Sequence, residues 1–165
     1  MKRHSFTLLE LLVSIGIILV LAAISFGGMN YASKRAQEAK TLATMEEFTN
    51  ALESFKQDYG FYPIIDKDSA KEVDLSADGW KLFMNEESKP NKKNRPYMEG
   101  DRGPLYDAYG QKFWYQYPGK KNTAKYDLWS MGPDKYHGIK KNNSSNDISK
   151  AGVDESDDIC SWKQR

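Results

Sequence analysis

This sequence of 165 residues contains little cysteine and histidine, and it has almost no excess of charge of either sign. The single cysteine, Cys160, excludes an intramolecular disulfide and a cysteine-based zinc cluster. The two histidines, His4 and His137, belong to none of the common hydrolase or zinc motifs, so we expect no catalytic activity. The 24 basic and 23 acidic side chains give a formal net charge of +1, which argues against nucleic acid as a partner.

Charge is nearly absent between Phe6 and Met29, where Glu10 is the single charged residue. As a helix this segment would be about 36 Å long, enough to span a bilayer. The short basic stretch before it, residues 1–5, favours a cytoplasmic N-terminus and export of the chain after Met29. The sequence therefore predicts a transmembrane and assembly helix over residues 6–29 and a globular head over residues 30–165.

A carboxylate inside an apolar helix needs a partner, and three interpretations of Glu10 follow. A cleaved signal peptide would use a site near residues 23–25, and a simple uncleaved anchor would leave Glu10 unexplained. Cleavage between Ser5 and Phe6 would instead remove a leader of residues 1–5 and create an ammonium group at Phe6. That group would lie one helical turn before Glu10, on the same face of the helix.

Residues 2–10, KRHSFTLLE, resemble the class III signal of type IV pilins and type II secretion pseudopilins, which is a basic leader followed by FTLxE and an apolar stretch. The resemblance implies that a prepilin peptidase cuts between Ser5 and Phe6 and that the new amine of Phe6 is methylated. It also implies that Glu10 pairs with the N-terminus of a neighbouring subunit during assembly. Because Ser5 stands where the family normally has glycine, we expect slow processing.

Apolar residues continue at a spacing of three or four as far as Tyr59, which predicts that the helix extends to a C-cap at Gly60. Alternating aromatic residues over 113–117 and a second run over 126–130 predict two antiparallel strands that cover this helix. The predicted fold class is α+β and pilin-like. A long N-terminal helix, with a transmembrane half and a docking half, packs against a small antiparallel β-sheet head.

Charged side chains of both signs lie along the helix between residues 34 and 58, where we expect a solvated face, with some charges available to neighbours in a filament. A basic cluster follows at residues 89–95. It is short and lacks interleaved aromatic residues, so we expect a mobile surface loop rather than a nucleic-acid site.

Residues 130–134, SMGPD, and 157–162, DDICSW, resemble the two motifs that bracket a calcium site in the major pseudopilin. By this match Asp134, Asp157 and Asp158 would supply side-chain oxygens and Met131 a backbone carbonyl, and calcium prefers such oxygen ligands. The 22 residues of 135–156 form a much longer loop than the family has, and residues 146–148 imitate the second motif. The ligand register therefore stays open, and an acidic tail without metal is the alternative.

Taken together, the resemblance implies a structural subunit of a periplasmic pseudopilus, with its N-terminus in the cytoplasm and its head in the periplasm. The implied partners are further copies of the chain in a helical filament, other pseudopilins, the prepilin peptidase and an inner-membrane assembly platform. One alternative is a type IV pilin or minor pilin used in adhesion, motility or DNA uptake. Another is a membrane-anchored module that binds carbohydrate through Trp114 and Trp129, although the alternating pattern favours core packing of these rings.

Overall fold

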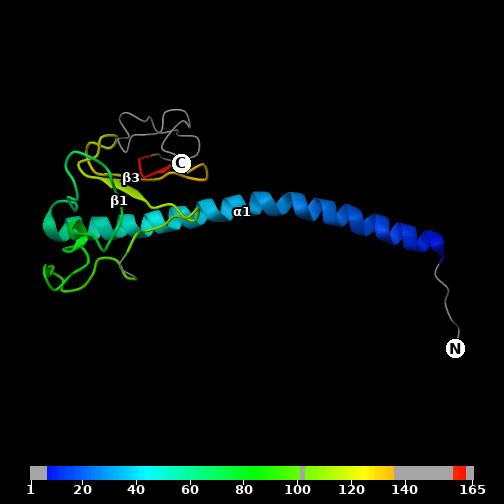
Figure 1. Cartoon of the computed structure of the whole chain (residues 1–165), viewed down its shortest axis with the longest axis horizontal. Coiled ribbons are helices and arrows are strands. Elements are labelled where there is room, and N and C mark those ends of the chain that lie inside the picture. Colours follow the sequence, from blue (N-terminus) through cyan, green and yellow to red (C-terminus); the bar gives the residue numbers. More distant parts are fainter. Residues whose placement is uncertain (1–6, 101–102, 136–157, 163–165) are drawn as a thin grey trace. The chain divides into compact units, whose positions relative to one another are not determined.

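The computed structural model describes residues 7–100, 103–135 and 158–162. It contains one α-helix, one short 3-10 helix and a four-stranded antiparallel sheet, which confirms the predicted α+β class (Figure 1). The elements in chain order are α1 (Leu8–Tyr59), β1 (Lys71–Glu72), η1 (Asp78–Trp80), β2 (Trp114–Gln116), β3 (Asp127–Ser130) and β4 (Ile159–Cys160). The chain divides into two compact units, Met1–Gln37 and Glu38–Arg165, and the helix α1 contributes to both.

The helix α1 ends at the residue that the sequence pattern indicates. No proline interrupts residues 8–59, so every backbone N–H of the helix interior can donate its hydrogen bond. At the end, Gly60 has a φ of +81°, and its N–H donates to the carbonyl of Lys56 at 2.7 Å. This left-handed conformation costs little for glycine, and the C-cap predicted at Gly60 is confirmed.

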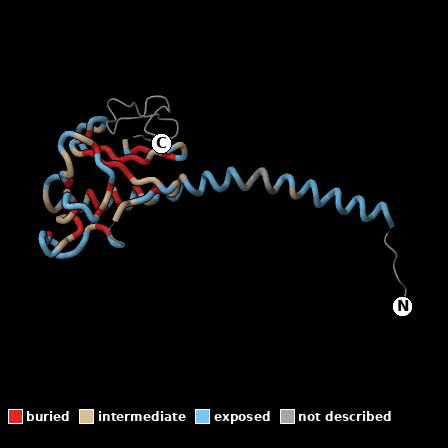
Figure 2. The backbone as a smooth tube through the Cα atoms, viewed as in Figure 1, coloured by how far each residue is buried: buried red, intermediate tan, exposed pale blue. Residues whose placement is uncertain are grey.

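The core of the second unit lies between the C-terminal half of α1 and one face of the sheet (Figure 2). Phe48 of α1 is fully buried, with ring centroids 5.4 Å from Trp80 and 6.4 Å from Tyr115. A fully buried side chain of this size contributes about 1.5–3 kcal/mol relative to exposure. The helix face with a spacing of three or four therefore fixes α1 in the head through Met45, Phe48, Leu52 and Phe55.

The sheet has the order β1-β2-β3-β4, and its register confirms the predicted aromatic alternation. Tyr115 lies opposite Leu128, and both side chains join the core against α1. Trp114 lies opposite Trp129, and these rings point to the other face, where they stack at 6.2 Å. Trp114 is 7% exposed and Trp129 is 1% exposed, so neither ring offers the open face that a carbohydrate platform needs. The carbohydrate-binding alternative is therefore not supported.

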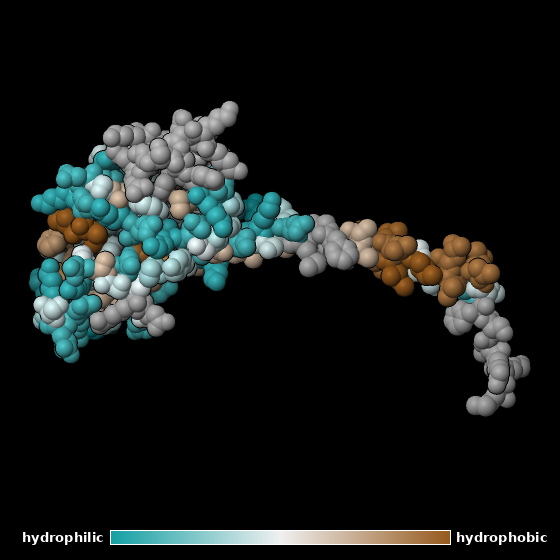
Figure 3. Space-filling model, viewed as in Figure 1, coloured by the Kyte–Doolittle hydropathy of each residue, from teal (hydrophilic) through white to brown (hydrophobic). Residues whose placement is uncertain are grey.

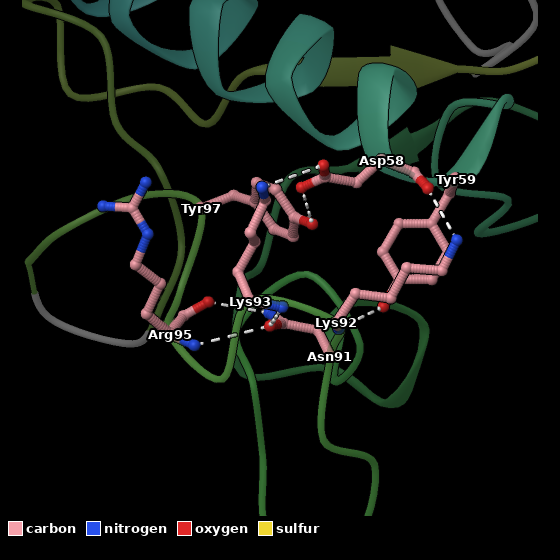
Figure 4. A network of polar contacts seen from close by, with 7 residues as sticks. All are labelled: Asp58, Tyr59, Asn91, Lys92, Lys93, Arg95 and Tyr97. Carbon is pink, nitrogen blue, oxygen red and sulfur yellow. Dashed lines mark hydrogen bonds and ion pairs between the residues drawn. The ribbon is translucent and has the colours of Figure 1, made fainter.

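The basic stretch of residues 89–95 forms a mostly exposed loop, as predicted, and it is tied to the C-terminal end of α1 (Figure 4). The backbone N–H of Lys92 donates to the Tyr59 hydroxyl at 2.8 Å, and its ammonium donates to the carbonyl of Asp58 at 2.7 Å. Lys93 forms an ion pair with the Asp58 carboxylate at 3.3 Å. Cations are stabilised beside the carbonyl end of a helix, and these contacts place two lysines there.

Candidate assembly segment and calcium loop

The N-terminal part of α1 exposes a continuous set of large apolar side chains. Figure 3 shows these brown residues gathered along the helix. Exposed apolar areas of this extent mark surfaces that another molecule or a membrane covers. Their exposed fractions range from 50% at Ile15 to 83% at Leu8. The set comprises Leu8, Leu9, Leu11, Leu12, Val13, Ile15, Ile17, Ile18, Leu19, Val20, Leu21 and Ile24.

The sequence predicts that residues 6–29 cross a membrane. In the part of the chain that the structure describes, no helix is long and apolar enough to do so. The side chains of residues 25–29 lie outside the described set, as do residues 1–6. The predicted cleavage site at Ser5 and Phe6 therefore stays a prediction.

Glu10, the predicted assembly residue, is exposed and caps the N-terminus of its own helix. The backbone N–H and the hydroxyl of Thr7 both donate to Glu10 Oε2 at 3.3 Å, and the Glu10 N–H donates to Thr7 Oγ1 at 3.3 Å. This reciprocal pair is a capping box, which satisfies backbone donors that no carbonyl of the helix can reach. The sequence signal for this capping box is Thr-x-x-Glu before an apolar run.

Two of the predicted calcium ligands, Met131 and Asp158, flank the adjoining ends of β3 and β4. Ser130 of β3 lies opposite Ile159 of β4, so the same antiparallel register continued by one residue places Met131 opposite Asp158. Asp158 is only 1% exposed, and Asp134 follows three residues after Met131. Asp157, the fourth predicted ligand, lies outside the described residues.

The donor chemistry of this region fits calcium. Carboxylate and carbonyl oxygens are the ligands that calcium selects, and a buried carboxylate such as that of Asp158 is stable only with compensating partners. Among residues 7–100, 103–135 and 158–162 no group of three or more His, Cys, Asp or Glu side chains is arranged to hold a metal. Asp134 and Asp158 are the two predicted carboxylate ligands that lie within the described residues.

A further buried carboxylate, that of Asp107, lies beside this loop and was not singled out from the sequence. It is 7% exposed and accepts hydrogen bonds from the backbone N–H groups of Tyr109 and Gln111 at 2.9 and 2.8 Å. It also accepts a hydrogen bond from the Ser130 hydroxyl at 2.5 Å. The Asp-x-x-Gly pattern of residues 107–110 signals the turn, but no local signal reveals the contact with Ser130, 23 residues away.

Two family models match the chain. Residues 1–26 match the prokaryotic N-terminal methylation motif, which identifies the class of N-terminal segment. Residues 29–151 match the model described as type II secretion system (T2SS), protein G. The chain belongs to this protein G family, and the resemblance predicted from the N-terminal signal is confirmed. The match ends before Asp157, so the calcium site stays a prediction.

Two relatives carry the name of this family, and one solved structure has been aligned with the chain. Type II secretion system core protein G of Vibrio cholerae is 28% identical over 140 residues, which are 83% of this chain and 85% of that protein. The protein of the same name from Klebsiella pneumoniae is 27% identical over 162 residues, which are 98% of this chain and 95% of the relative. The crystal structure of the major pseudopilin of enterohaemorrhagic Escherichia coli aligns with a TM-score of 0.48 and 17% identity, and the alignment covers 81% and 93% of the two chains.

Proposed function

We propose that this chain is the structural subunit of a periplasmic pseudopilus of type II secretion and that it acts by assembly rather than by catalysis. The observation that carries the proposal is the exposed apolar surface of α1 between Leu8 and Ile24, in which Glu10 is the single charged residue. Burying each leucine or isoleucine of this surface away from water, in a membrane or against neighbouring subunits, contributes about 1.5–3 kcal/mol. The proposed partners are further copies of the chain, other pseudopilins, the prepilin peptidase and the inner-membrane assembly platform.

Glu10 would set the axial position at which neighbouring subunits align in the filament. In the single chain its carboxylate lies at the helix start, exposed to water and bonded to Thr7. In a filament core it would lose that water, and a buried carboxylate without a cation is strongly destabilising. The ammonium group at Phe6 of a neighbouring subunit supplies the cation, after cleavage at Ser5 and methylation of Phe6.

The location that we propose is the inner membrane before assembly, with the N-terminus cytoplasmic and the head periplasmic, and the pseudopilus afterwards. Its support is the basic leader of residues 1–5 and the 16 uncharged residues of 11–26. The match of residues 1–26 to the methylation motif agrees with processing at the membrane.

We also propose that the head binds one calcium ion through side-chain oxygens of Asp134, Asp157 and Asp158 and the carbonyl of Met131. A bound ion would offset most of the charge of these carboxylates and fasten the chain after β3 to the segment before β4. Because calcium would bind the folded chain and not the unfolded chain, it would raise the free energy of unfolding.

The assembly proposal is tested by electron microscopy of filaments sheared from cells that express the secretion system. Glu10→Gln retains the capping box, because glutamine serves at that position, but it removes the charge. We expect this variant to lose filaments. Thr7→Val is the matched control, since it removes the capping hydroxyl and keeps the carboxylate, and it should still assemble. Filaments of Glu10→Gln at the parental level would contradict the charge-pairing mechanism.

The processing step is tested by mass spectrometry of the mature N-terminus of protein extracted from membranes. The expected species begins at an N-methylated Phe6. Retention of Met1 would show a simple uncleaved chain, and a start near Phe26 would show an ordinary signal peptide. Either result would contradict the proposed route into the filament.

A further inference from the structure

Asp107 opens a turn that is hydrogen-bonded both to the helix α1, through Ala108, and to the strand β3 before the predicted calcium loop. The turn that contains it is closed by a hydrogen bond from its own N–H to the carbonyl of Gln111 at 2.8 Å. Its Oδ1 atom accepts the N–H groups of Tyr109 and Gln111, which leaves Oδ2 directed to the strand β3. A buried carboxylate that accepts three hydrogen bonds is held in a single orientation.

On the helix side, the turn is fastened to Thr41. The backbone N–H of Ala108 donates to Thr41 Oγ1 at 3.1 Å, and Thr41 is fully buried on α1. The contact joins residues 67 positions apart in the sequence. The backbone next to Asp107 is therefore fixed to the helix on which the head is built.

On the loop side, Ser130 carries the connection onward. The Ser130 hydroxyl donates to Asp107 Oδ2 at 2.5 Å. Ser130 Oγ also accepts a hydrogen bond from the N–H of Gly132 at 3.0 Å. Ser130 is fully buried. Gly132 has a φ of +66°, a backbone angle that residues other than glycine rarely adopt. The residue between them is Met131, whose carbonyl is a predicted calcium ligand. The Asp107–Ser130 bridge thus sets the backbone on both sides of that carbonyl.

We propose that Asp107 is a positioning residue for the calcium loop, which orients the Met131 carbonyl and the start of the Gly132–Asp134 turn through Ser130. This inference rests on the proposed calcium function. Replacing a residue that hydrogen-bonds directly to a metal ligand typically changes metal affinity by about 10- to 100-fold, and Asp107 would act on the Met131 carbonyl through Ser130. The same bridge makes the loop geometry depend on Thr41 of α1.

Two variants separate this role from a general effect on folding. Ser130→Ala removes the bridge and leaves the Asp107 turn intact. Asp107→Asn keeps an Oδ1 acceptor for Tyr109 and Gln111, but it presents an N–H donor to the Ser130 oxygen in place of an acceptor. The matched control is Ser76→Ala, because the Ser76 hydroxyl makes a similar bond to Asp74 at 2.6 Å in the exposed loop before η1.

The experiment is isothermal titration calorimetry, in which calcium chloride is added to the full chain in detergent. Melting temperatures are measured in parallel with calcium and with EGTA. We expect Ser130→Ala and Asp107→Asn to bind calcium at least about 10-fold more weakly than the parent, whereas Ser76→Ala keeps the parental affinity. The rise in melting temperature on adding a fixed calcium concentration should shrink in the two bridge variants only.

Each outcome has a distinct meaning. If Ser130→Ala melts lower with and without calcium but keeps the parental calcium affinity, the bridge is only structural and the positioning role is overturned, while the calcium site stands. If the parent itself takes up no calcium, the proposed calcium function is overturned, and the positioning role with it. Failure of Asp107→Asn to fold would leave Ser130→Ala as the deciding variant.

Discussion

The hydroxyl of Tyr97 donates a 2.7 Å hydrogen bond to the carboxylate of Asp58, which lies 39 residues earlier near the end of α1 (Figure 4). This bond is the leading cause of a lowered pKa at Asp58, with a further contribution from Lys93. Burial raises the pKa of Tyr97, and the bond to Asp58 raises it further, so the phenol stays protonated and able to donate. The two residues fix the segment before Met98 to the helix.

Replacement of Tyr97 by phenylalanine removes this bond and keeps the ring. We expect the melting temperature to fall by about 2–4 °C, since the ring packing against Phe55 and Phe83 is retained. Tyr106→Phe is the matched control because Tyr106 is 53% exposed, and its melting temperature should stay within about 1 °C of the parental value. An equal effect of both substitutions in circular dichroism melts would show that the Asp58 contact contributes nothing specific.

Acid should lower the free energy of unfolding of the head over a pH range that Asp66 partly sets. The backbone N–H of Asp68 and the ammonium of Lys71 lower the pKa of Asp66 from 3.8 to about 2. A folded-state pKa below the unfolded value gives a stabilisation that is present above the unfolded value and is lost as pH falls through the folded value. Urea unfolding between about pH 5 and pH 2 should therefore show a shallower loss of stability in Asp66→Asn than in the parent. Parallel curves would exclude this contribution.

The turn between β2 and β3 requires glycine at position 119. Asp127 is fully buried and accepts the N–H groups of Lys120, Lys121 and Asn122 at 2.6, 2.8 and 2.7 Å. A Cβ atom at Gly119 would lie 2.4 Å from the Asn122 carbonyl oxygen and 2.9 Å from Asp127 Oδ1. Gly119→Ala should therefore cost about 1–3 kcal/mol of unfolding free energy.

The control for this substitution is Gly103→Ala, because a Cβ atom there has no heavy atom within 4 Å. Its unfolding free energy, measured by urea titration, should stay within about 0.5 kcal/mol of the parental value. If Gly119→Ala is as stable as Gly103→Ala, the turn of residues 119–122 around Asp127 can adjust to a Cβ atom at little cost in free energy.

Ser5 should make maturation slow. Ser5→Gly restores the residue that the resemblance leads us to expect before the cut, and the smaller side chain should accelerate removal of residues 1–5. Pulse-labelled protein resolved by mass provides the rate, and the steady-state level of mature protein provides a second reading. Equal processing rates for the parent and Ser5→Gly would show that the peptidase tolerates serine fully.

Elements with a repeating pattern could be predicted from the sequence, and contacts between distant segments could not. The spacing of apolar residues that ends at Tyr59 located α1, and the alternation around Tyr115 located β2. Both patterns are visible in the sequence because apolar side chains repeat on the buried face of a helix or strand. The strands β1 and β4 were missed, because a strand of two residues is too short to show an alternating pattern of apolar and polar side chains. The bond between Asp107 and Ser130 was missed because it depends on how the turn after residue 106 packs against β3.

The tryptophans of this chain make its two units optically separable. All four, Trp80, Trp114, Trp129 and Trp162, belong to the unit Glu38–Arg165. The buried indole rings of Trp80 and Trp129 should emit at short wavelength and shift to the red when the head unfolds. Intrinsic fluorescence therefore reports on the head alone, and the association of the N-terminal segments can be followed independently by light scattering in the same sample.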